Sequence, residues 1–153
     1  MYNDLKILIT NQQKSKVKLN LIKSIAKDTL NNLGCQDNAE LSILLTDNTC
    51  IRKLNNRYLK KDKPTDVLSF PMLDFNSAFR IPHSALFLGD IVISVETAQK
   101  QSQKLGITVY EEISKLLIHG ILNLLGFDHE KGKKEAVKMR KEEERLLDRV
   151  QNQ

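Results

Sequence analysis

The 153-residue sequence contains no tryptophan, two cysteines and three prolines, and it lacks any long hydrophobic run. Cys35 and Cys50 form no CxxC pair, so we expect two reduced, partly buried thiols and neither a zinc ribbon nor a disulfide framework. No stretch approaches the roughly 18 apolar residues of a membrane span, and the N-terminus lacks the pattern of a secretion signal. These absences favour a cytosolic protein.

Hydrophobic residues make up 41% of the chain, which is enough to bury one core, so we expect a single domain over residues 1–153. The net charge is +5, and it is concentrated rather than diffuse. The segment 52–63 holds one acidic residue, Asp62, and six basic ones: Arg52, Lys53, Arg57, Lys60, Lys61 and Lys63. Such a cluster suits a polyanionic partner such as nucleic acid.

The spacing of apolar residues predicts both strands and helices. Alternating or β-branched runs predict strands at 5–10, 39–46, 67–70 and 86–94. Helical spacing predicts helices over 18–33, after the caps at 47–49, over 95–105, from 109 to 125, and from 131 onward. Ser94 should cap the helix over 95–105, and the capping box Thr108-x-x-Glu111 should begin the helix from 109 to 125. From the second helix we expect inward-pointing side chains at Ile51, Leu54 and Tyr58. The charges of the last helix should be solvated, over a buried stripe of Ala136, Met139, Leu146 and Val150.

One histidine stands out because it lies in an apolar helix, where an imidazole needs a partner. His119 and Asn123 are four residues apart and therefore share one helix face, while the turn at Gly126 carries His129 back toward them. Gly120 would allow another segment to approach closely. Three protein ligands with one open position form the catalytic arrangement for zinc. The alternative is a buried, hydrogen-bonded structural histidine. His83, in the irregular loop 74–84, is expected to be solvent-exposed.

The segment His119-Gly-Ile-Leu-Asn-Leu-Leu-Gly-Phe-Asp-His129 resembles the His-Gly-x-x-His-Leu-x-Gly-[Tyr or Phe]-Asp-His signature of the YbeY family of bacterial endoribonucleases. Two further blocks match in the same order, Lys61-Asp-Lys-Pro-Thr-Asp-Val-Leu-Ser-Phe-Pro71 and Leu88-Gly-Asp-Ile-Val-Ile93. The resemblance implies an α+β fold with a small mixed sheet and an interior helix that bears the histidine. It also implies one zinc ion held by three histidines, and cleavage of single-stranded RNA in 16S rRNA 3′-end maturation and ribosome quality control.

The sequence departs from this pattern at two positions. The middle histidine of the signature aligns with Asn123, whose neutral amide oxygen is a poor zinc ligand beside an imidazole. The arginine before the Lys-Asp-Lys-Pro block aligns with Leu59, which carries no charge to place against a phosphate. Arg57 and Lys60 flank that position and are candidates to replace the arginine; the alternative is that they are solvated loop charges. Asp66 and Asp128 are candidates to complete a metal shell, although Asp128 more naturally orients a histidine or caps the next helix.

Two functions follow from this pattern. The first is a metal-dependent endoribonuclease whose metal is held by His119, Asn123 and His129. Its substrate is RNA of the small ribosomal subunit, which is bound by Arg57, Lys60, Lys61 and Lys63. The second is a catalytically weakened or inactive family member that still binds RNA or the ribosome. A HExxH metalloprotease is excluded because Gly120 occupies the position of its glutamate. We expect no DNA or membrane partner.

Overall fold

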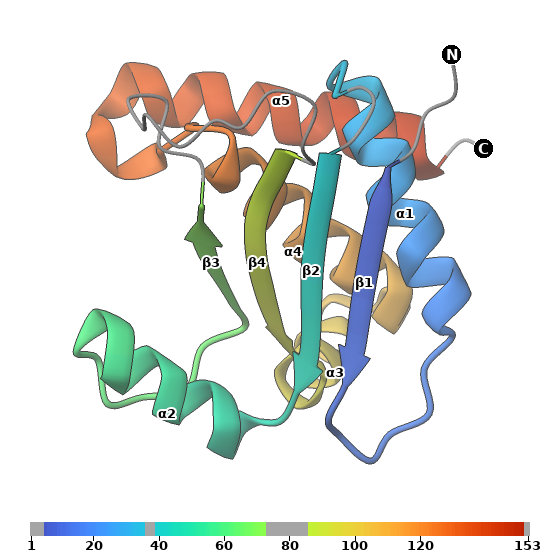
Figure 1. Cartoon of the computed structure of the whole chain (residues 1–153), viewed down its shortest axis with the longest axis vertical. Helices are drawn as coiled ribbons and strands as arrows, with labels where there is room; N and C mark the ends of the chain where they lie inside the picture. The colour runs from blue at the N-terminus through green and yellow to red at the C-terminus, as the bar shows by residue number, and fades with distance from the viewer. Residues whose placement is uncertain (1–4, 36–38, 73–85, 152–153) are drawn as a thin grey trace.

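The computed structural model describes residues 5–35, 39–72 and 86–151, so the predicted loop at 74–84, with His83, lies outside the described residues. Its centre is a four-stranded sheet of β1 (Lys6–Asn11), β2 (Ala39–Thr46), β3 (Val67–Pro71) and β4 (Leu86–Ser94). The strand order is β1-β2-β4-β3 (Figure 1). The pairs β1–β2 and β2–β4 are parallel, whereas β3 runs antiparallel to β4 at one edge. The predicted α+β fold with a small mixed sheet is confirmed.

The helices begin and end close to the predicted signals. Their bounds are α1 (Leu19–Asn32), α2 (Asn48–Leu59), α3 (Val95–Leu105), α4 (Val109–Leu124) and α5 (Lys133–Gln151), with a 3₁₀ turn η1 (His129–Lys131). The side chain of Ser94 caps α3 by accepting from the Thr97 N–H, and Thr108 caps α4 by accepting from the Glu111 N–H. Each bond satisfies a backbone donor that the first turn of a helix leaves unpaired.

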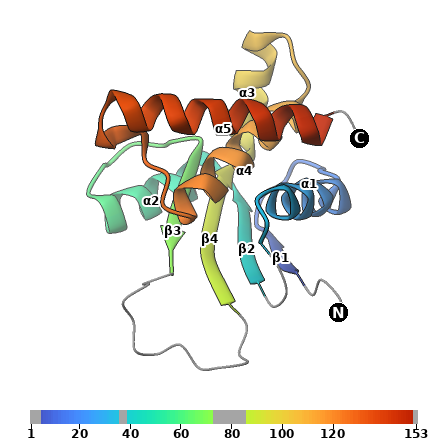
Figure 2. The ribbon, with the colours of Figure 1, turned by 90° about the horizontal axis from the view of Figure 1, so that it is seen from above.

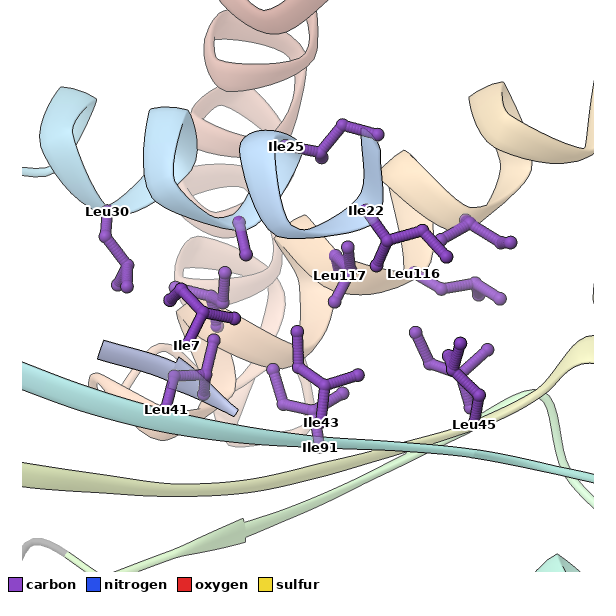
Figure 3. Packing of buried hydrophobic residues seen from close by; sticks show 14 of the residues in the cluster. Ile7, Ile22, Ile25, Leu30, Leu41, Ile43, Leu45, Ile91, Leu116 and Leu117 are labelled. Carbon is purple, nitrogen blue, oxygen red and sulfur yellow. The ribbon is translucent and has the colours of Figure 1, made fainter. Parts of the chain in front are cut away.

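The core lies between the sheet and the helices α1 and α4. Figure 3 shows isoleucine and leucine side chains of β1, β2 and β4 directed at the apolar faces of these two helices. The opposite face of the sheet is covered over β3 and β4 by α2, whose Ile51 packs with Leu68 and Val92. Figure 2 shows α5 crossing over α4, and the two helices are in contact. Helix α4 is thus packed on several sides, as its apolar composition predicts.

Gly120 explains how closely α4 approaches the sheet. A Cβ atom at this position would come within 3.1 Å of the Ile91 side chain of β4 and 3.2 Å of the Ser69 Oγ of β3. The Ser69 hydroxyl also donates to the Gly120 carbonyl at 3.3 Å. The predicted close approach at Gly120 is therefore confirmed, and it brings the preceding residue, His119, to the edge strand β3.

Several local predictions differ from the structure. Tyr58 does not point inward: it is 56% exposed, because it lies near the end of α2, where its ring only meets Phe70 edge-on. The last helix begins at Lys133 rather than at Lys131, since η1 and Gly132, with φ of 120°, intervene. In its predicted stripe Met139 and Leu146 are buried, but Ala136 and Val150 are only half-buried.

Two expectations drawn from absences can be compared with the structure. Cys35 and Cys50 are both free and half-buried, as predicted. Among the described residues, no helix combines the length and the apolar character needed to cross a lipid bilayer.

Candidate active site

The two motif histidines and Asn123 line one pocket of about 610 Å³. Its walls come from α4, the edge strand β3, the turn after α2, and α5. The ring centres of His119 and His129 are 5.4 Å apart, and their planes are inclined by 52°. Residues that are ten positions apart in sequence therefore face one another across a short gap.

The chain after α4 brings His129 back to this pocket. Gly126 adopts a φ of +99°, which favours glycine, and the next N–H, of Phe127, donates to the Leu122 carbonyl at 3.0 Å. Asp128 then starts η1, because its Oδ1 accepts from the Glu130 N–H at 2.9 Å. Asp128 thus acts as the cap of the next turn, and it lines an adjoining pocket that also contains His129 and Asn123.

Glu143 of α5 is the hydrogen-bond partner of His119. The Nδ1–H of His119 donates to Oε2 of Glu143 at 3.3 Å, and both side chains are about one-third exposed. This hydrogen bond, aided by the charges of Glu143 and Asp66, raises the pKa of His119 against the lowering effect of partial burial. Since Nδ1 is occupied, Nε2 is the nitrogen left to bind a ligand, which is the usual arrangement of a metal-binding histidine.

A second carboxylate, Glu112, lies at the wall of the same pocket and is only 3% exposed. Its Oε2 accepts from the Gln101 amide, which also donates to Oδ2 of Asp66 at 3.4 Å. The Lys115 Nζ is 3.5 Å from Oε1 of Glu112. Asp66 itself lines the pocket, but its Oδ1 already accepts from the Val67 N–H at 2.8 Å. The predicted alternative metal ligand Asp66 is therefore engaged in a local network.

Only part of the basic segment 52–63 lies at the pocket. Lys61 and Lys63 line the pocket, whereas Arg57 and Lys60 are exposed outside it. Buried Asn55 anchors the turn by donating to the Lys63 carbonyl at 2.9 Å.

Two other residues of this segment bear on the charge near the pocket. Arg52 forms an exposed ion pair with Asp62 at 2.8 Å, so part of the positive charge is neutralised locally. Leu59 lines the pocket beside Asn123 and His129, so the position aligned with the motif arginine does lie at the site.

The donors present can be compared with the needs of a metal ion. In the part of the chain that the structure describes, no group of three or more histidine, cysteine, aspartate or glutamate side chains could hold one. Two imidazoles and the Asn123 amide do share the pocket. Zinc binds an imidazole nitrogen at about 2.0–2.1 Å, which brings the centres of two rings on one ion to about 5 Å. The observed 5.4 Å fits two histidine ligands on one ion, with the amide oxygen as a weaker third donor.

The sequence analysis did not single out Glu112, Lys115 and Glu143, three charged residues that line the pocket. The first two could have been found, because they precede His119 by seven and four residues and so share its helix face. Glu143 is 24 residues from His119 and lies on a different helix, so no local spacing indicates it. The expectation that the charges of the last helix are all solvated is wrong for Glu143, which is turned toward the pocket.

The comparisons with known proteins agree with the resemblance in the motifs. Residues 8–151 match the model of the family described as "Endoribonuclease YbeY". The chain is 44% identical to Endoribonuclease YbeY of Aquifex aeolicus, covering 94% of this chain and 91% of that protein. It is 42% identical to Endoribonuclease YbeY of Persephonella marina, covering 86% and 82%.

A solved structure shares the fold. The solution structure of TM1509 from Thermotoga maritima superposes with a TM-score of 0.63 at 23% identity, covering 94% of this chain and 89% of that one. At this identity the likeness speaks for the fold alone. The family match and the curated relatives extend over nearly the whole length, and they show that this chain belongs to the YbeY endoribonuclease family.

Proposed function

We propose that this protein is an endoribonuclease that hydrolyses single-stranded RNA. It uses a divalent metal ion, zinc, which is held by His119, His129 and Asn123. The observation that carries the proposal is the 5.4 Å separation of the two imidazole rings in one pocket with Asn123. A structural histidine needs only a hydrogen-bond partner, which Glu143 already supplies to Nδ1. A second imidazole in the same pocket adds a further donor of the kind that zinc takes in proteins.

The chemistry divides between the ion and the side chains of the pocket. When bound, a divalent cation supplies Lewis acidity, which lets a water molecule lose a proton near neutral pH and stabilises charge on the phosphodiester. Glu143 keeps the proton of His119 on Nδ1 and fixes the orientation of the ring. Lys61 and Lys63 present ammonium groups to the same pocket, where they can bind phosphate oxygens.

Single-stranded RNA is the substrate that suits the surface beside the pocket. Arg57 and Lys60 extend the basic surface beyond Lys61 and Lys63. Next to them Tyr58 is exposed and forms an edge-to-face pair with Phe70 at 5.3 Å. Exposed aromatic rings next to cations bind unpaired bases by stacking, which a duplex does not offer. From the likeness to the family, we further propose the 3′ end of 16S rRNA as substrate and a role in ribosome quality control.

The test combines metal content with cleavage. Protein purified at neutral pH should contain close to one metal ion per chain and should cut a single-stranded RNA, and His119→Ala should lose both properties. Gln103→Ala, exposed on α3 away from the pocket, is the matched control and should keep both. Wild-type protein that is purified without metal and binds RNA fully, yet does not cut it when zinc is supplied, would contradict the proposal and favour the RNA-binding alternative.

A further inference from the structure

Lys115 is a cation of the pocket that no motif indicates. It lies on α4 one helical turn before His119, so the two side chains leave the same helix face about 6 Å apart. Both residues line the 610 Å³ pocket together with Asn123 and His129. Leu59 lines the same pocket but offers no charge.

Glu112 holds the ammonium group of Lys115 in place. The Lys115 Nζ forms an ion pair at 3.5 Å with Oε1 of Glu112, a buried oxygen that has no hydrogen-bond partner among the described residues. A buried carboxylate without a compensating cation is strongly destabilising, so Glu112 favours conformers of Lys115 that stay at the pocket wall. An ammonium group has three donors, so the ion pair with Glu112 leaves donors of Lys115 for a ligand.

The other lysines of the pocket are placed differently. Lys61 and Lys63 lie on the exposed turn after α2, across the pocket from α4, and no carboxylate lies within ion-pair distance of either among the described residues. Lys115 is anchored on a rigid helix, its side chain is 45% exposed, and it adjoins His119. It is therefore the cation best placed to meet the phosphate closest to that histidine.

We propose that Lys115, positioned by Glu112, binds the RNA phosphate next to His119 and supplies there the positive charge that Leu59 does not provide. The inference rests on the proposed function for the identity of the ligand, a single-stranded RNA. The contact is electrostatic and independent of the base, so its loss should weaken binding of all sequences alike.

The experiment measures binding without cleavage. Affinity of metal-free protein for a single-stranded RNA is determined in chelator over a series of salt concentrations. Loss of one phosphate contact in Lys115→Met should make the negative slope of log K against log salt shallower by about 0.7. Lys115→Arg should keep the wild-type slope because it keeps the cation. Lys104→Met, exposed on α3 outside the pocket, is the matched control and should also keep it.

A second variant guards against a folding defect. Lys115→Met leaves Glu112 buried without its cation, whereas the double variant Glu112→Gln/Lys115→Met removes both charges together. The double variant should show the same loss of slope. An unchanged slope in both variants, or an equal loss in Lys115→Arg, would overturn the inference. Because no metal is present, failure of this experiment can be told apart from failure of the proposed function, which fails if metal-loaded wild-type protein cuts no RNA.

Discussion

Replacing Asn123 by histidine should raise the affinity of the protein for zinc. The residue lies four positions after His119 on α4 and lines the same two cavities as His129, so a new imidazole would meet both existing ones. The substitution should cost little in folding. Asn and His have similar helix propensities, and the larger ring can extend into the pocket instead of the core, because Asn123 is half-buried.

The size of the gain follows from the donor set. Loss of an outer partner of a metal ligand commonly weakens binding by about 10–100-fold, and exchange of a direct ligand should matter at least as much. Restoring the third imidazole should therefore improve zinc affinity by at least about tenfold, or about 1.4 kcal/mol. At saturating metal the same increment should appear as added stability, seen as a rise of several degrees in the melting temperature.

Chelator competition at neutral pH measures this affinity directly. Asn123→Ala, which removes the amide oxygen, should bind zinc more weakly than the wild type. Asn56→His introduces the same side chain at an exposed position of α2 outside the pocket, and it should leave the affinity unchanged. Equal affinity of Asn123→His and wild type would refute the reasoning, because it would mean that α4 does not present position 123 to the metal.

Three further predictions concern the pocket and its support. Glu143→Leu should weaken zinc binding by about 10–100-fold in the same chelator competition, because His119 loses its orienting carboxylate. The control is Glu144→Leu at the exposed neighbouring position, and an equal loss of zinc affinity in both variants would contradict the positioning role of Glu143. Reversing two charges in Lys61→Glu/Lys63→Glu should weaken RNA binding and make the negative slope of log K against log salt shallower by about 1.4. An unchanged slope would mean that the RNA binds to another surface. Gly89→Ala should lower the free energy of unfolding in urea by more than about 2 kcal/mol, since its Cβ would lie 2.3 Å from the Phe70 carbonyl oxygen at a φ of +139°. Gly34→Ala, at a φ of +74° with open space around it, should lose clearly less, and equal losses would count against the clash.

Most of the fold could be predicted because its signals are local. The strands β2 and β4 occur at the predicted residues, and Ser94 and Thr108 cap α3 and α4 as their spacing indicates. Tyr58 was misplaced because helical spacing shows which face a residue occupies, but not whether the neighbouring strand extends far enough to cover it.

The sequence by itself determined the part of the site that depends on spacing along one chain segment: His119 and Asn123 on one helix face, the return of His129 after Gly126, and the basic turn that contains Lys61 and Lys63. Helix geometry and turn chemistry make such short-range relations readable. Only the tertiary structure decided the strand order β1-β2-β4-β3 and the contact between Glu143 of α5 and His119 of α4. These depend on how whole elements pack across the core, and spacing along the chain does not specify which of several packed arrangements has the lowest free energy.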